Sequence, residues 1–203
     1  MRTTLLFYVS MAVLAAILLG PACGRQERGG KRETKAAATE SASERITLTP
    51  GRSAGQINIG DADTAVRRHL GPPDLSDAAM GKAILVWHTK ADDTIYPLSV
   101  FTARDMGNDE TARIKQIRIT SPQFETRNGL RPGVPLRELS IAYPHALHIV
   151  ETYEAGGQQY SVYDTREGIA FEVDSADVCT AIIIQEKGDA TRPYLALRQT
   201  ASQ

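Results

Sequence analysis

The chain has 203 residues and carries 23 Lys and Arg residues against 24 Asp and Glu residues, a formal net charge of −1. This balance, with no basic stretch interleaved with aromatic residues, argues against nucleic-acid binding. Cys23 and Cys179 are the two cysteines of the sequence, so a framework of several disulfides is excluded.

The N-terminus has the order of an export signal. Arg2 supplies a positive charge, and an apolar run of fifteen residues from Leu5 to Leu19 follows, shorter than the roughly 20 residues of a spanning helix. Gly20, Pro21 and Ala22 then precede Cys23, an arrangement that resembles the bacterial lipobox and implies a lipid on that cysteine. Ordinary cleavage after Ala22 without lipid, and an uncleaved membrane anchor, stay open as alternatives.

We therefore predict a lipoprotein-type signal peptide over residues 1–22 and a lipid, such as palmitate, on Cys23. This places the protein on the bacterial cell envelope, held to the membrane and facing the periplasm or the exterior. Residues 23–45 are predicted to be a flexible linker, because they are charged, rich in small residues and free of aromatics. Its early basic residues fit either attraction to anionic head groups or a solvated spacer. Residues 46–200 are predicted to fold as a single domain.

Within that domain one pattern occurs twice, at about residues 57–120 and about 130–185. Each copy opens with four residues that end in a glycine, continues six positions after that glycine with the apolar residue of a short amphipathic helix, and ends in several strands. The matching positions are Gly60 and Val66 in the first copy and Gly133 and Leu139 in the second.

Alternation and apolar runs predict the strands of each copy. They are expected at 83–88, 98–102, 114–120, 147–152, 159–164, 169–173 and 180–185. Two helix-then-strand units predict an α+β fold, in which two tandem helix-plus-antiparallel-meander units form a sheet with helices on one face.

Several spaced positions of this pattern resemble a known family. They are Gly60, Val66, Leu70-Gly71, Pro73, Trp87, Leu98–Phe101 and Ile117. They look like the SmpA/OmlA family, the small lipoprotein of the bacterial outer-membrane assembly machine. A doubled unit is similar to the secreted β-lactamase-inhibitor-protein fold. The resemblance implies a non-catalytic module that binds or assembles an envelope protein partner, with an inhibitor of an exported enzyme as the alternative.

Candidate catalytic groups do not converge. Residues 51–55 match G-x-S-x-G, but that motif activates a serine at a strand-to-helix turn, and here it lies at the domain edge without a suitable helix. His145 and His148 would share a face only in a helix, whereas Pro144 and the apolar run after it favour an extended chain.

The remaining reactive groups also have ordinary interpretations. The acidic pairs Asp92-Asp93 and Asp74/Asp77 are typical of solvated turns, and Cys179 precedes an apolar run, as a buried thiol does. We predict no catalytic residue, no metal and no cofactor. A hydrolase using Ser53 or a histidine is the weakest alternative.

Alternation along the strands also predicts a binding surface. The side beneath the helices would carry Val100, Val162, Ile169, Phe171 and Val173. The opposite side would present Phe101, Ser161, Tyr163, Ala170, Glu172 and Arg118. From this set we predict Phe101, Tyr163, Arg118 and Glu172 as partner-binding residues, because aromatic residues and arginine are enriched at protein interfaces. An ordinary solvated sheet face is the alternative.

Overall fold

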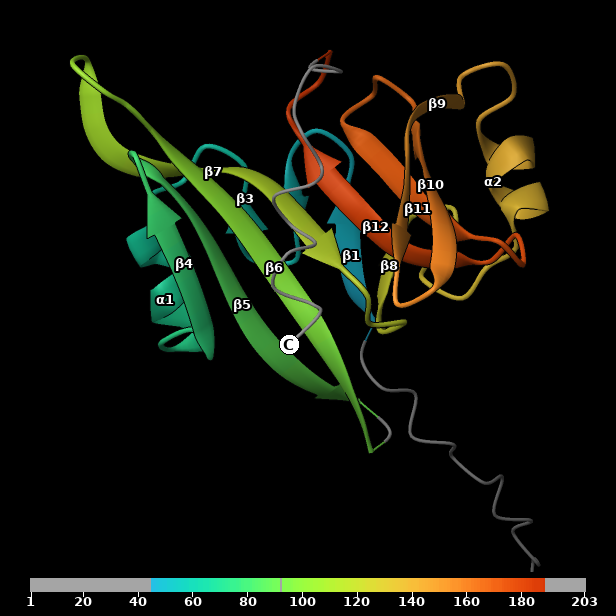
Figure 1. The fold of residues 1–203 in the computed structure, drawn as a ribbon, viewed down its shortest axis with the longest axis horizontal. Helices are drawn as coiled ribbons and strands as arrows, with labels where there is room; N and C mark the ends of the chain where they lie inside the picture. The colour runs from blue at the N-terminus through green and yellow to red at the C-terminus, as the bar shows by residue number, and fades with distance from the viewer. Residues whose placement is uncertain (1–44, 92, 189–203) are drawn as a thin grey trace, which may run out of the picture. The chain divides into compact units, whose positions relative to one another are not determined.

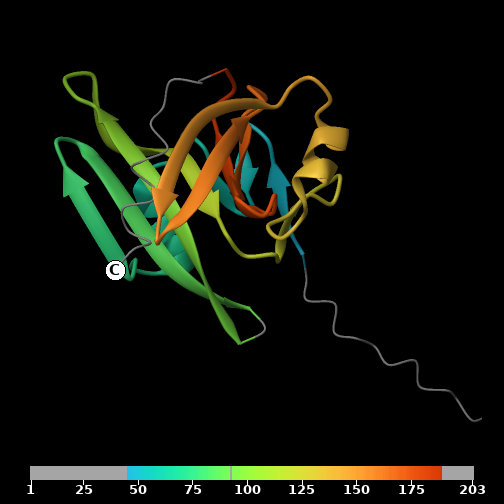
Figure 2. The same cartoon turned by 45° about the vertical axis from the view of Figure 1, so that its right-hand side comes forward.

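The computed structural model describes residues 45–91 and 93–188 (Figures 1 and 2). Several predicted features lie outside the described residues. They are the signal peptide, Cys23, all of the linker except Arg45, Asp92 and the residues after 188. No helix in the described ranges is long and apolar enough to cross a membrane.

Two sheets account for most of the described chain. The large sheet has eight antiparallel strands in the order β4-β5-β6-β7-β12-β11-β10-β9. Its strands are β4 (Leu75–Ala79), β5 (Lys82–Ala91), β6 (Thr94–Asp105), β7 (Asp109–Ile119), β9 (His148–Ala155), β10 (Gln158–Asp164), β11 (Ile169–Asp174) and β12 (Cys179–Gln185).

The small sheet has four short strands in the order β3-β2-β1-β8 and lies behind the large sheet in Figure 1. Its strands are β1 (Ile46–Thr49), β2 (Ser53–Ala54), β3 (Ile57–Asn58) and β8 (Phe124–Thr126). The pairing of β1 with β8 is parallel, and the other pairings of this sheet are antiparallel.

Two short helices precede the two halves of the large sheet along the chain. Helix α1 (Asp63–Leu70) is followed by β4 to β7, and helix α2 (Leu136–Ala142) is followed by β9 to β12. The two four-stranded meanders join where β7 pairs with β12, and there Ile119 lies opposite Ile182.

The predicted α+β class is wrong, because the described chain is mostly β-sheet and does not form a sheet covered on one face by helices. Helices α1 and α2 have eight and seven residues, and each buries a single side chain, Val66 and Leu139. The layer against the large sheet comes largely from the small sheet instead. Its strands have two to four residues, too few for the period-two alternation by which strands are recognised.

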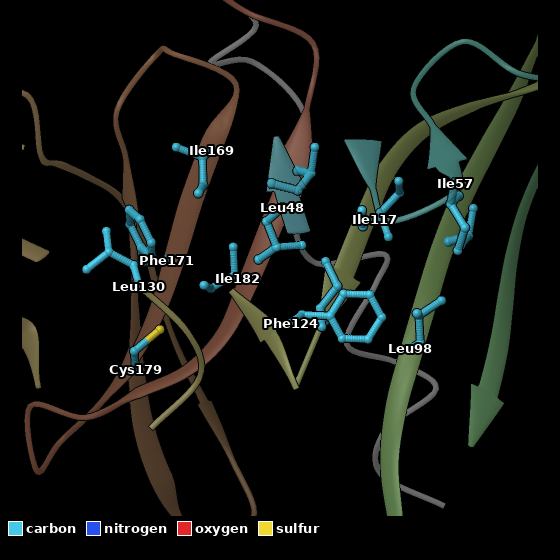
Figure 3. Close-up of a cluster of buried hydrophobic side chains, with 14 of the residues drawn as sticks. Leu48, Ile57, Leu98, Ile117, Phe124, Leu130, Ile169, Phe171, Cys179 and Ile182 are labelled. Atoms are coloured by element: carbon cyan, nitrogen blue, oxygen red, sulfur yellow. The ribbon is translucent and has the colours of Figure 1, made fainter. Parts of the chain in front are cut away.

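The main hydrophobic core lies between the two sheets (Figure 3). Leu48, Ile57 and Phe124 of the small sheet belong to the same buried cluster as Leu98, Ile117, Ile169, Phe171 and Ile182 of the large sheet. We call this side of the large sheet the core face and the opposite side the polar face. Alternation places on the polar face Ser99, Phe101, Gln116, Arg118, Tyr153, Tyr160, Val162, Asp164, Ala170, Glu172, Ile183 and Gln185.

A contact between two turns attaches the small sheet to the large one. The N–H of Gly51, between β1 and β2, donates to the carbonyl of Gly168 at 2.9 Å. The N–H of Gln185 donates to the same carbonyl at 3.1 Å. Gly168 has a φ of +84°, and a Cβ added there would collide with the backbone of Gly51. Glycine is therefore required at position 168 by both its conformation and its neighbour.

We expect Gly168→Ala to lower the free energy of unfolding by about 3 kcal/mol or more, since the clash adds to the left-handed strain. Gly157→Ala is the matched control, because Gly157 has a φ of +75° but no atom within 4 Å of an added Cβ. Gly157→Ala should lower the free energy of unfolding by about 1 kcal/mol, because only the left-handed conformation is unfavourable for alanine there. Urea unfolding of both variants measures the difference, and equal losses would contradict a role for the close approach.

Candidate functional site

The polar face brings together charged, amide and aromatic side chains from six neighbouring strands, β6, β7, β12, β11, β10 and β9. Arg118 on β7 and Glu172 on β11 lie on either side of β12, which separates the two strands. In the registers, Arg118 is opposite Ile183 and Glu172 is opposite Ala181. Paired residues of antiparallel strands point to the same face, so both charged groups project from the same side of the sheet.

Arg118 and Glu172 form a buried ion pair across β12. Arg118 donates from Nη2 to Glu172 Oε1 at 2.6 Å and from Nε to Oε2 at 3.2 Å. The two side chains are only 8% and 2% exposed. Thr180 Oγ1 donates to Glu172 Oε1 at 2.9 Å, and the Tyr153 hydroxyl also bonds to this carboxylate. The carboxylate is therefore fixed by three different side chains.

Both members of this pair are held in their charged forms. Burial alone would favour the neutral forms, but for Arg118 the negative charge of Glu172 and the hydrogen bonds to its carboxylate together outweigh burial and raise the pKa. For Glu172, burial is outweighed by the charge of Arg118 and by hydrogen bonds from Arg118, Tyr153 and Thr180, so its pKa lies below the ordinary value. The two directions agree and describe a tight ion pair.

A chain of polar side chains lies next to the ion pair. Gln116 Nε2 donates to Gln185 Oε1 at 2.9 Å, and Gln185 Nε2 lies 3.5 Å from Asp164 Oδ2. Within the described ranges, two buried side-chain atoms have no hydrogen-bond partner, Gln116 Oε1 and Arg118 Nη1. One accepts and the other donates, and both come from the same face of β7. Each of these two unpartnered atoms lowers the stability of the folded protein.

Aromatic side chains lie beside this network. The rings of Tyr153 and Tyr160 stack with centroids 5.1 Å apart and an interplanar angle of 18°. Phe101 and Tyr153 pack against a small buried cluster formed by Val162, Ala170 and Ile183. Phe101, Tyr153 and Tyr160 are themselves half-buried, so each offers part of its ring to a contact. The site thus combines an apolar aromatic surface with a rigidly held charge pair.

The structure divides the four predicted binding residues. Phe101, Arg118 and Glu172 share the polar face, but Tyr163 pairs with Phe171 and packs against the main core. Val162, predicted to face the core beside Phe171, pairs with Glu172 instead. The prediction for β10 therefore exchanged its two faces. Ser161, predicted to lie opposite the core, pairs with Val173 and lies on the core face.

Arg118 and Glu172 also differ from expectation in being buried. Each lies between two buried apolar neighbours in its own strand, Ile117 and Ile119 for the first, Phe171 and Val173 for the second. A lone charge inside such a run signals a buried pair, because an isolated buried charge is very costly. That signal was present in the sequence. Tyr153, Tyr160, Thr180, Gln116 and Gln185 were not predicted to take part.

The candidate catalytic groups do not assemble. Ser53 is buried in the β1–β2 hairpin, where it pairs with Thr49 and is followed by strand β3 rather than directly by a helix. His145 lies in a turn with a φ of +65°, and His148 is the exposed first residue of β9. In the described part of the chain, no three His, Cys, Asp or Glu residues are close enough to hold a metal ion.

The other reactive groups are hydrogen-bonded, exposed or buried singly, and none of them belongs to a catalytic arrangement. The main-chain N–H of His88 donates to Asp74 Oδ2 at 2.6 Å and is the main reason why the pKa of Asp74 is lowered. Asp77 is exposed on the edge strand β4. Burial raises the pKa of the Cys179 thiol, which donates to the carbonyl of Ala181 at 3.4 Å. Such a thiol is a poor nucleophile.

No protein-family model and no curated protein matches the chain. Two solved structures are weakly similar. YjgB, a DUF4309 family protein of Bacillus subtilis, has a TM-score of 0.42 and 13% identity over 68% of this chain and 88% of its own. The uncharacterized protein YfeY of Escherichia coli has a TM-score of 0.31 and 12% identity over 70% of this chain and 99% of its own. Neither is described as an SmpA/OmlA protein or a β-lactamase inhibitor.

We expect Glu172→Gln to destabilise the protein by about 3–5 kcal/mol at neutral pH, because Arg118 is left buried without its counter-charge. The double variant Arg118→Met, Glu172→Leu should recover most of this loss, since an apolar pair avoids desolvating two charges. Urea unfolding of wild type and both variants measures the effect. A single variant as stable as wild type would contradict the importance of the pair.

The same pair predicts a pH dependence. Because the folded-state pKa of Glu172 lies below its ordinary value of 4.5, its contribution to stability is complete above that pH and is lost as the pH falls through the folded-state pKa. Below pH 4.5 the stability of wild type should therefore decline more steeply than that of the double variant. Unfolding curves at successively lower pH test this, and parallel declines would contradict it.

Proposed function

We propose that the protein is an exported, lipid-anchored envelope protein that acts without catalysis by binding a protein partner through the polar face. The proposal combines the signal and cysteine at the N-terminus with the surface formed by Phe101, Tyr153 and Tyr160. By its resemblance to a tandem SmpA/OmlA unit, we propose that the protein acts as an assembly or scaffolding module of the envelope.

The observation that carries the proposal is the aromatic surface next to the Arg118–Glu172 pair. Aromatic residues dominate the residues whose truncation weakens protein complexes. Half-buried rings that are already packed lose little conformational freedom on binding, which favours affinity. Tyr153 is oriented by both its stack on Tyr160 and its bond to Glu172. The ion pair thus positions a contact surface rather than a reactive group.

Anchoring is tested at Cys23. We expect the mature wild-type protein to begin at this residue, to carry acyl mass and to sediment with membranes, because small residues directly precede it. Cys23→Ala should lose both properties, whereas Cys179→Ala, the control, should keep both. Intact-mass analysis of the membrane fraction tests this expectation. A mature protein without acyl mass would contradict the lipoprotein proposal.

Binding is tested by photo-crosslinking in intact cells. A photoreactive side chain at position 101 or 160 should give one discrete adduct, because both positions are partly exposed on the polar face. The control is position 141 on α2, where the side chain of Ile141 is 72% exposed. An adduct that forms equally from position 141 would contradict a specific surface. Mass spectrometry of the adduct identifies the partner, and loss of that partner's enzymatic activity on binding would indicate the inhibitor alternative.

Phe101→Ala and Tyr160→Ala should each weaken the affinity for that partner by about tenfold or more, as truncation of a central aromatic contact does. Tyr163→Ala is the matched control, since this tyrosine packs against the core from the opposite face. It should reduce the melting temperature and leave the affinity unchanged. Equal affinity losses in all three variants would show that destabilisation, not contact, is responsible.

A further inference from the structure

The outer edge of strand β9 is not paired with any strand in the described part of the chain. β9 is the last strand in the order of the large sheet, and there it pairs with β10 alone. It has eight residues, His148–Ala155, without proline, lysine or glycine, whereas β4 at the opposite edge has five residues. A long edge strand without such residues presents a row of free main-chain groups to which another extended chain can bind.

The turn that joins β9 to β10 shows which main-chain groups of β9 face its neighbour. Gly156 and Gly157 form a two-residue turn, with φ angles of +59° and +75°. In such a hairpin the flanking residues, here Ala155 and Gln158, exchange hydrogen bonds. Because bonding alternates along antiparallel strands, Tyr153 also bonds to β10. The residues between these positions direct their N–H and C=O groups outward.

A second bond gives the same alternation from the other side of β10. The N–H of Thr165 donates to the carbonyl of Ile169 at 3.2 Å, which continues the register between β10 and β11. In steps of two along β10, the odd-numbered residues therefore bond to β11 and the even-numbered residues bond to β9. Both observations leave the N–H and C=O groups of Thr152 and Glu154 pointing away from β10.

The side chains of this edge are acidic and apolar. Ile149 is 59% exposed and Val150 is 38% exposed, so two consecutive branched apolar residues are in contact with solvent. The strand has two acidic residues, Glu151 and Glu154, and no lysine or arginine. The half-buried ring of Tyr153 lies between these two acidic residues in the sequence. An extended chain that binds here would therefore meet negative charge and apolar surface together.

We propose that β9 accepts an antiparallel strand from a basic segment of a partner protein. Thr152 and Glu154 exchange main-chain hydrogen bonds with this segment, and these bonds supply the affinity. Glu151 and Glu154 are three residues apart, so two basic residues at the same spacing lie opposite them. The residue opposite Tyr153 is apolar and packs beside the ring. Directly opposite side chains of antiparallel strands are about 5 Å apart, close enough for these contacts.

The charges favour a basic segment of another protein over a second copy of this chain. A second copy would add its own Glu151 and Glu154, so like charges would gather along one short interface. Like charges across a strand pair are destabilising, whereas opposite charges stabilise it. The contact goes beyond the polar face, because it uses main-chain groups of the edge, and Phe101 on β6 is separated from β9 by four strands.

The test measures binding of the labelled peptide Thr-Thr-Lys-Val-Thr-Lys-Val-Thr to the purified full-length protein by fluorescence anisotropy. In the proposed pairing its two lysines lie opposite Glu154 and Glu151, and its first valine lies opposite Tyr153. A peptide with glutamate in place of both lysines should bind at least about tenfold more weakly, because its carboxylates meet those of β9. Equal binding of the two peptides would contradict the charge complementarity on which the proposal depends.

N-methylated peptides test the main-chain bonds without changing the protein. Methylation of the first lysine and of the threonine after the first valine removes the two N–H groups that face β9, so binding should be lost. Methylation of the first valine and the second lysine removes N–H groups that point away from β9, so the affinity should stay within about twofold. Equal affinities of the two methylated peptides would overturn the proposal.

Variants of the protein locate the contact. Thr152→Pro removes an N–H that the pairing with β10 does not use, a substitution that edge strands tolerate, and should abolish peptide binding. Thr152→Val, the matched control, keeps this N–H and should bind as wild type does. Glu154→Lys should weaken binding by about fivefold or more, whereas the same change of charge at Asp77 on β4 should not. Phe101→Ala should leave peptide binding unchanged, which separates this edge from the polar face.

The same measurements show which other contact would replace this one. An equal loss of affinity in Glu154→Lys and Asp77→Lys would overturn the proposal in favour of a general electrostatic attraction. A dimer of the protein alone in sedimentation, if Thr152→Pro dissociates it, would replace the partner with a second copy. A loss of peptide binding in Phe101→Ala would assign the peptide to the polar face instead.

Discussion

The pairing of β7 with β12 is the constraint that makes one sheet from two separate meanders. Both faces of the sheet specify its register. On the core face, Ile119 lies opposite Ile182 and Ile117 opposite Ile184, and all four side chains are buried. On the polar face, Gln116 bonds to Gln185 at 2.9 Å. A shift by one residue would turn the isoleucines to the polar face and drive Arg118 into the core. The two strands are therefore held in one register by apolar packing and polar contacts together.

The Arg118–Glu172 pair extends this constraint across a third strand. It connects β7 to β11 over β12, so three strands and both meanders are linked through one interaction. Buried ion pairs contribute little to stability when compared with an apolar pair of the same volume. In some proteins such pairs specify one arrangement of the chain, and here the pair also holds the hydroxyl of Tyr153. The geometry of the candidate site and the register of the sheet thus depend on the same pair.

The strands with strong apolar runs could be predicted from the sequence. Residues 180–185 and 169–173 were expected as strands and are found as Cys179–Gln185 and Ile169–Asp174. The small sheet could not be predicted, since strands of two to four residues carry no period and one of its pairings joins β1 to the distant β8. Edge strand β4 was missed because all five of its residues are exposed. Two short amphipathic helices were given too much weight in the fold class.

The candidate site could be predicted only in part, because local sequence patterns do not show which strands pair or in which register. In β10, Val162 and Tyr163 are both large and apolar, so alternation alone permits either assignment of the two faces, and pairing with β11 decides it. The partners Arg118 and Glu172 are 54 residues apart in the chain. A sequence shows that a charge lies in an apolar run, but not which distant charge it meets. Long-range register is therefore the information that local patterns lack.

Two places in this protein depart from what the fold alone would select. One is the polar face, where central strands carry charges and amides instead of apolar residues. The other is the turn at Met80, where a bulky apolar residue takes a left-handed conformation in full exposure. At Gly168, by contrast, the residue type agrees with the fold, because glycine meets both the tight contact and the positive φ. Departures of this kind concentrate at sites selected for contact rather than stability. The charges and amides of the polar face are therefore the reason why we propose a contact there.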